Sequence, residues 1–126
     1  MLILAKKITE IDVGQLMLVY KESNSKKGAT LYPHFSTVEQ NLMVEQDLLE
    51  YLCEILQDKQ STIAVWASDG QYKAALRLEP YADGLLLTAL ETIPEARRMG
   101  YAEALLRNVI LTLDVGTIYS HVRKDN

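Results

Sequence analysis

The residues whose types and spacing most clearly indicate chemistry are Arg97, Arg98, Gly100 and Ala102. They open a helical pattern that follows an apolar run and a break at Pro94. A helix start leaves several backbone N–H groups unpaired and carries about half a positive charge, so it can bind an anion. Gly100 allows close approach, and the two arginines add mobile positive charge that suits a diphosphate. The alternative is an ordinary helix cap beside two solvated arginines.

The elements around this turn are predicted from hydrophobic periodicity. The apolar run Leu85 to Leu90 is too dense for a strand with one face in water, so it predicts a buried strand that feeds the helix. The helix is expected from about Gly100 to Leu113, with Gly116 beyond its last turn. A fifth strand, Thr117 to Val122, should lie parallel to the Leu85 strand, because one crossover helix joins them.

The rest of the chain predicts a strand, two helices and a hairpin before that point. Capping boxes at Asp12 and Thr37 each precede a helical apolar pattern, and Asp69-Gly70 is a strong hairpin signal. The predicted elements are a strand at 2–6, helices at 13–23 and 37–57, a loop at 24–36, and strands at 62–67 and 71–79. Along the second helix, the apolar residues at 38, 42, 49, 52, 55 and 56 are expected to face the core.

Composition limits the possible classes of protein. A chain of 126 residues fits one domain, and a net charge of −4 with a pI near 5.1 argues against general nucleic-acid binding. The apolar stretch Met1 to Ala5 is far shorter than a signal-peptide core or a membrane span, so we expect a cytoplasmic protein without a membrane partner. The single cysteine, Cys53, excludes an internal disulfide and a multi-cysteine metal site, and its spacing predicts a buried filler.

A family resemblance follows from these residues. The order of strand, acidic residue, proline and then Arg97-Arg98-Met99-Gly100-Tyr101-Ala102 resembles the acyl-coenzyme A pyrophosphate loop of GNAT-superfamily N-acyltransferases. That pattern is Gln or Arg, two free positions, Gly, one free position, and Gly or Ala. The resemblance implies an α+β fold with a mixed, mostly antiparallel sheet flanked by helices, in the order β-α-α-β-β-β-α-β. It covers about the first two thirds of such a domain, so we expect residues 1–126 to be a single, C-terminally incomplete GNAT-like domain.

The resemblance also implies a function. We expect an N-acetyltransferase that transfers an acetyl group directly from acetyl-coenzyme A to a small-molecule or peptide amine. In the family, the pantetheine arm lies where the fourth and fifth strands splay apart. The implied cofactor-binding residues are Leu90, Glu91, Thr92, Arg97, Arg98, Met99, Gly100, Tyr101, Ala102, Glu103 and Asn126. Two alternatives remain: a non-catalytic acyl-coenzyme A-binding or homodimerisation module with an open sheet edge, and an unrelated α+β domain.

Acetyl transfer to an amine needs a base that removes a proton from the ammonium. By position, Glu91 at the end of the fourth strand and His121 on the fifth are the candidates, and their alternatives are a surface carboxylate and a solvated edge histidine. Tyr32, His34 and Phe35 are candidate acceptor contacts, or aromatics that pin a loop to the surface. The tyrosine that usually reprotonates the leaving thiolate lies in the family on a helix without a counterpart in this chain.

Overall fold

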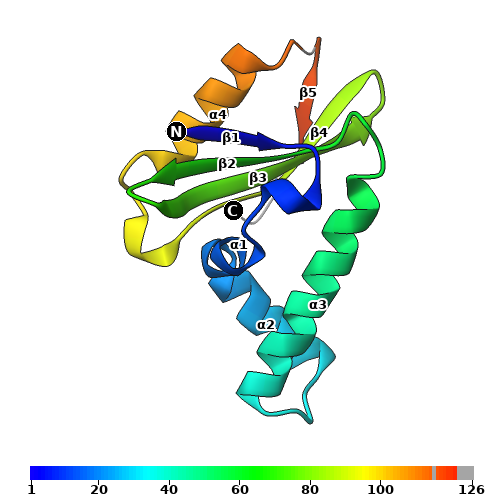
Figure 1. Ribbon diagram of the computed structural model, residues 1–126, viewed down its shortest axis with the longest axis vertical. Helices are drawn as coiled ribbons and strands as arrows, with labels where there is room; N and C mark the ends of the chain where they lie inside the picture. The colour runs from blue at the N-terminus through cyan, green and yellow to red at the C-terminus, as the bar shows by residue number, and fades with distance from the viewer. Residues whose placement is uncertain (115, 122–126) are drawn as a thin grey trace.

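The computed structural model describes residues 1–114 and 116–121 (Figure 1). Its strands are β1 Leu2–Ala5, β2 Thr62–Ser68, β3 Gln71–Tyr81, β4 Gly84–Thr92 and β5 Ile118–Ser120. Its α-helices are α1 Val13–Val19, α2 Lys21–Leu31, α3 Thr37–Ile55 and α4 Tyr101–Thr112, with short 3-10 helices η1 Ile8–Glu10 and η2 Pro94–Ala96. Within the described ranges, no helix combines the length and apolar character that crossing a membrane requires.

The five strands form one sheet in the order β1-β2-β3-β4-β5. The first four are antiparallel neighbours, and β5 lies parallel to β4. The predicted α+β class with a mostly antiparallel sheet is therefore confirmed, as is the parallel β4–β5 pair. The hairpin at Asp69-Gly70 is also confirmed, because β2 and β3 pair from Ser68 and Gln71 outward.

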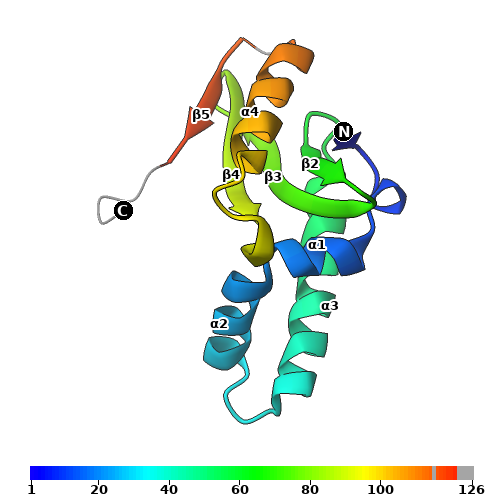
Figure 2. The same ribbon diagram turned by 90° about the vertical axis from the view of Figure 1, so that its left-hand side faces the viewer.

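Helices cover both faces of the sheet. On one face, Leu105 and Val109 of α4 pack with Ala64, Leu76 and Leu78 of the central strands. The core on the opposite face is made by α1, α3 and the same strands, and includes Leu16, Val19, Tyr20, Leu52, Ile63 and Val65. In Figures 1 and 2 the hairpin of α2 and α3 extends away from the sheet.

The helices begin at local capping signals. The Asp12 carboxylate accepts the Gln15 N–H at the start of α1, so the Asp12 half of the predicted capping box is present, whereas the Gln15 side chain donates to the Gly70 carbonyl and accepts the Tyr72 N–H instead. At α3 the capping box consists of Ser36 and Glu39, one residue before the predicted pair. A capping box satisfies two backbone donors at either position. The sequence therefore correctly predicted a box at the start of α3 but placed it one residue too late.

The segment between β1 and α3 differs most from the prediction. The predicted helix 13–23 is interrupted at Tyr20, and α2 continues through residues predicted as a loop. Gly28 in α2 packs against Gln40 and Val44, and its missing side chain lets the two helices approach closely. Tertiary contact with α3 thus overrides the poor helix propensity of the Ser, Asn and Gly residues in this segment.

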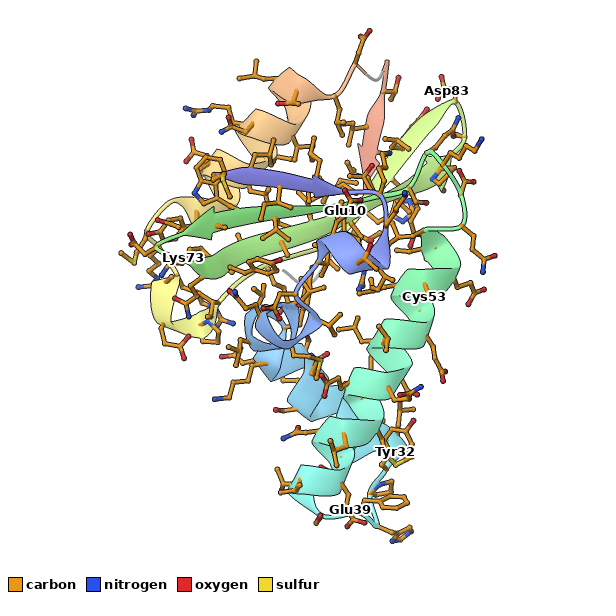
Figure 3. The ribbon with its side chains drawn as sticks, in the orientation of Figure 1. Glu10, Tyr32, Glu39, Cys53, Lys73 and Asp83 are labelled. Carbon is orange, nitrogen blue, oxygen red and sulfur yellow. The ribbon has the colours of Figure 1, made fainter. Side chains whose placement is uncertain are left out.

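The buried face of α3 also differs from the predicted stripe. Val44, Leu48 and Leu52 are buried, whereas Val38 and Leu42 are exposed. Cys53 is exposed too, so the prediction of a buried filler was wrong (Figure 3). Val38 and Leu42 are exposed because the first turns of α3 project beyond the sheet, where only α2 can cover them.

Candidate active site

The predicted anion loop forms the start of α4. Gly100 is the N-cap residue, with φ 83° and ψ 9°, and no side chain caps this helix end. The first bond of the helix is Ala104 N–H to the Gly100 carbonyl. Among the described residues, the N–H groups of Tyr101, Ala102 and Glu103 therefore have no protein acceptor. A Cβ added to Gly100 would meet no atom within 4 Å, so the helix end faces open space.

Backbone strain marks the same region. Within residues 1–114 and 116–121, four non-glycine residues have positive φ, and Asp69 and Ala82 lie in hairpin turns, where such angles are ordinary. The other two are Arg98, with φ 66°, and Ala89, with φ 56°. A left-handed non-glycine residue costs about 1–3 kcal/mol and persists only where its surroundings enforce it. Arg98 shapes the turn before α4, and Ala89 shapes β4.

The two arginines of the turn, Arg97 and Arg98, have different surroundings. Arg97 makes a two-pronged ion pair with Glu22 of α2, with N–O distances of 3.0 Å. The hydrogen bond from Arg97 and then its charge lower the pKa of the Glu22 carboxyl. Arg97 therefore ties the turn to α2, while Arg98 is exposed. Lys73 of β3 lies with its Nζ 5.8 Å from the centre of the Tyr101 ring, beside the segment that leads to α4 (Figure 3).

Strand β4 carries a bulge opposite Leu76. Ala75 pairs with Glu91 and Arg77 pairs with Thr88, so Ala89 and Leu90 together face one residue of β3. The buried Tyr20 hydroxyl donates to the Ala89 carbonyl at 2.7 Å. Burial raises the pKa of Tyr20 far above its usual range, so the phenol keeps the proton that it donates. Tyr20 thus fixes the bulge from the α1 side of the sheet.

The pairing between β4 and β5 is short. It runs from Leu85 with Ile118 to Leu87 with Ser120. Strand β4 continues to Thr92, and among the described residues no β5 partner meets it after Leu87. The stretch from Thr88 to Thr92 therefore presents main-chain groups beside the start of α4. Leu90, Glu91 and Thr92, predicted to bind the pantetheine arm, lie in this stretch.

The two candidate bases lie in different surroundings. Glu91 is half-buried, and its Oε2 accepts a hydrogen bond from the Ser23 hydroxyl at 2.9 Å. His121 is exposed, and its ring lies edge-on to Tyr81 with the centroids 5.4 Å apart. Tyr81 begins the turn that leads into β4, whereas Glu91 lies near the end of that strand. The structure therefore does not bring these two side chains together.

The predicted acceptor residues lie at the α2–α3 connection. Tyr32 donates a hydrogen bond to Asp47 of α3 and meets Phe35 edge-on, with the ring centroids 6.1 Å apart. His34 and Phe35 are exposed. Tyr32 lies at the end of the helical hairpin that points away from the sheet (Figure 3). Their contact with an acceptor stays a prediction, and Asn126 lies outside the described residues.

Sequence reasoning missed the residues that hold the site in shape. Tyr20 and Ser23 reach across 69 and 68 positions to Ala89 and Glu91. Lys73 approaches Tyr101 from β3. In the sequence, Tyr20 has only the spacing of a core residue. Its hydroxyl partner is set by the packing of α1 on the sheet, for which no local signal exists.

Comparison with known proteins identifies the fold. No protein-family model and no curated protein sequence matches the chain. Among solved structures, a GNAT family acetyltransferase from Staphylococcus aureus superposes with a TM-score of 0.69 at 16% identity, over 100% of this chain and 88% of that one. The ribosomal-protein-S18-alanine N-acetyltransferase from Escherichia coli gives a TM-score of 0.62 at 18% identity, over 100% of this chain and 70% of that one.

A third similar structure contains coenzyme A. The PaiA N-acetyltransferase from Thermoplasma acidophilum, solved in complex with coenzyme A, superposes with a TM-score of 0.52 at 13% identity. The match covers 88% of this chain and 70% of that one. The protein thus has the GNAT fold that its pyrophosphate-loop pattern predicted.

Proposed function

We propose, from the GNAT fold, that this protein is an N-acetyltransferase that transfers an acetyl group directly from acetyl-coenzyme A to a primary amine. The observation that carries the proposal is the uncapped start of α4, where three N–H groups have no acceptor among the described residues and the space beside the left-handed Gly100 is open. At this end of the helix Lys73 lies beside the Tyr101 ring, and the next residue of β3, Ala74, pairs with Thr92 in the part of β4 that continues beyond β5. An anion site thus adjoins a strand edge, which is the arrangement that a long phosphorylated thioester requires.

The proposed cofactor contacts are mostly main-chain. The N–H groups between Arg98 and Glu103 hold the pyrophosphate, and β4 from Leu90 to Thr92 pairs with the pantetheine arm. Arg98 and Lys73 supply the mobile positive charge, because Glu22 already engages Arg97. Met99, Tyr101 and Ala102 belong to the same loop, and Asn126 stays a predicted contact outside the described residues.

Glu91 is the proposed base. The acceptor ammonium has a pKa near 10.4 when free, so it must lose a proton before its nitrogen can attack. Glu91 directly follows the bulge on β4, and the Ser23 hydroxyl orients its carboxylate. Acetyl-coenzyme A supplies the thioester carbonyl, and a β4 N–H group beside the bulge is proposed to stabilise the oxyanion. His121 stays the second candidate for the base.

The proposal extends to the protein's setting. The acceptor is a small-molecule or peptide amine, residues 1–126 form a single domain, and the protein works in the cytoplasm. A second candidate is a non-catalytic acyl-coenzyme A-binding or dimerisation module. It is favoured by one observation: among the described residues β5 pairs only with β4, so its outer edge is open.

Calorimetric titration with coenzyme A tests the site. Gly100→Asp places a carboxylate beside the three free N–H groups. Gly70→Asp is the matched control, because Gly70 also has positive φ, 74°, and open space, and lies in the β2–β3 turn. Two like charges about 4 Å apart near a surface repel by about 4 kcal/mol before salt screening. We therefore expect Gly100→Asp to lose at least about tenfold in affinity and Gly70→Asp to bind as the wild type does.

Equal binding by the two variants would show that the assigned loop is wrong. An acetylation assay across a panel of amines then separates the transferase from the binding module. If Glu91→Gln abolishes turnover and His121→Gln does not, the result supports Glu91 as the base. Coenzyme A binding without turnover on any amine supports the module.

A further inference from the structure

A cavity lies between the α2–α3 hairpin and strand β3. Its volume is about 420 Å³. Its walls come from three elements, and the lining residues are Lys27, Leu31, Asp47, Leu48, Tyr51 and Arg77. Neither the pyrophosphate loop nor the candidate bases line it.

Arg77 of β3 is the central charged group of this cavity. Its guanidinium carbon lies 5.6 Å from the centre of the Tyr20 ring and 5.1 Å from that of Tyr51. Such contacts hold a guanidinium in place without neutralising it. Its Nε is shielded from solvent and has no hydrogen-bond partner, and among the described residues Arg77 forms no ion pair. Glu79, two residues along β3, accepts the Tyr51 hydroxyl at 2.7 Å and forms no ion pair with Arg77.

The other charges in the cavity favour an anion. Lys27 is exposed and, in the described part of the chain, makes no ion pair. Asp47 already accepts the Tyr32 hydroxyl. Two cations thus face one engaged carboxylate, while Leu31 and Leu48 add apolar walls. A small molecule with a carboxylate and a short apolar body fits this lining, whereas a polycation is repelled.

The cavity is also linked to the proposed reaction site. Arg77 pairs with Thr88 of β4, the residue immediately before the bulge at Ala89. The Tyr20 ring that faces Arg77 belongs to the residue whose hydroxyl holds the Ala89 carbonyl. An anion bound at Arg77 therefore lies on the same helix-covered face of the sheet as the Glu91 carboxylate, which bonds to Ser23 of α2.

We propose that the acceptor is an amino acid, and that Arg77 binds its carboxylate while its amino group reaches the bulge in β4. This inference rests on the proposed acetyltransferase function and specifies its substrate class. The two guanidinium NH2 groups beyond Nε suit a carboxylate, which accepts a two-pronged hydrogen bond. Lys27 adds a second positive charge at the mouth of the cavity.

The test compares matched ligands. Free leucine, leucinamide, a leucine dipeptide and spermidine are titrated into the whole chain, with and without saturating coenzyme A. We expect leucine to bind at least about tenfold more tightly than leucinamide, because a hydrogen-bonded charge contributes one to two powers of ten in affinity. The dipeptide tests whether the acceptor is a free amino acid or a peptide amine. If the dipeptide binds as tightly as leucine, the assignment to a free amino acid is overturned.

Variants assign the effect to Arg77. Arg77→Gln should lose the preference for leucine over leucinamide by about tenfold to hundredfold. Arg107→Gln is the control, since Arg107 is an exposed arginine paired with Glu103 on α4. If Arg77→Gln does not fold, Lys27→Gln gives the test instead, because Lys27 is exposed. Its loss should weaken leucine binding and leave leucinamide binding unchanged.

The outcomes separate this inference from the function on which it rests. Coenzyme A binding without a preference for the carboxylate overturns the inference alone. If the protein does not bind coenzyme A, the proposed transferase is overturned. If it still prefers leucine to leucinamide without coenzyme A, a carboxylate site at Arg77 is still supported. Tighter binding of spermidine than of leucine would overturn the assignment of the cavity's ligand class.

Discussion

The contact between Gly84 and Thr117 gives a sharp test of how β5 joins the sheet. A Cβ added to Gly84 would lie 2.1 Å from the Thr117 carbonyl oxygen and 3.2 Å from the Thr117 Cβ. Ordinary contact begins near 3.4 Å, so the oxygen must retreat by about 1.3 Å in Gly84→Ala. That carbonyl also accepts the Leu85 N–H at 3.1 Å, and a retreat of this size breaks the bond.

The expected loss of stability follows from these two effects. Forced overpacking costs about 1–3 kcal/mol, and the broken hydrogen bond adds about 1 kcal/mol. Gly84→Ala should therefore lower the free energy of unfolding by about 2–4 kcal/mol. Strand β5 meets β4 through three residue pairs, so this loss is large enough to detach it. Because β5 borders the proposed pantetheine gap, affinity for coenzyme A should fall as well.

Urea unfolding followed by circular dichroism measures the change. Gly116→Ala is the matched control, because a Cβ there would meet nothing within 4 Å. Both substitutions reduce the entropy of the unfolded chain equally, so their difference isolates the clash. A difference below about 0.5 kcal/mol would refute the reasoning, since β5 would then not depend on the close approach at Gly84.

Two further predictions concern the contacts around the site. Tyr20→Phe leaves the Ala89 carbonyl without its donor and should destabilise the protein by about 1–2 kcal/mol. Tyr51→Phe, at an exposed residue, should destabilise it less. Equal losses of the free energy of unfolding in urea would contradict a special role for Tyr20. The pKa of Glu22 is lowered, so its pairing with Arg97 stabilises the fold above the ordinary pKa of 4.5 and loses this effect as pH falls through the lowered value. Glu22→Gln should therefore destabilise slightly at pH 7, and this difference should shrink as the pH falls below 4.5 and also in 1 M salt; a difference that does not change with pH would contradict the ion pair as its cause.

The fold could be predicted where the determining signals are local. Asp69-Gly70 specified the β2–β3 turn, and the break at Pro94 followed by Gly100 specified the start of α4. Gly100 adopts the left-handed conformation for which glycine is suited, so the residue type and the backbone agree. The dense apolar run predicted the strand β4, but the expectation that it is buried was wrong for most of its length: Leu85 is buried, the strand is otherwise mostly half-buried, and Leu90 is exposed.

The rest could not be predicted because it depends on contacts between distant segments. The helix α2 has little apolar periodicity, and it forms because Gly28 allows it to pack on α3. The buried face of α3 is set by where the sheet ends and α2 begins. In the candidate site, the hydroxyl of Ser23 and the carboxylate of Glu91 meet across two elements, and no spacing in the sequence encodes that meeting.

The site is therefore best understood as two strained backbone segments held by the core. Ala89 and Arg98 each adopt a left-handed conformation that costs about 1–3 kcal/mol, and neither lies in a hairpin turn. The Tyr20 hydroxyl holds Ala89 from the α1 side of the sheet. The buried Ile93 and Ala96 anchor the turn that contains Arg98. Strain retained at two adjacent segments, beside free N–H groups, is expected where a backbone is shaped to receive a ligand. The same core residues thus serve stability and the proposed function together, so substitutions that relax Ala89 or Arg98 should stabilise the fold while weakening coenzyme A binding.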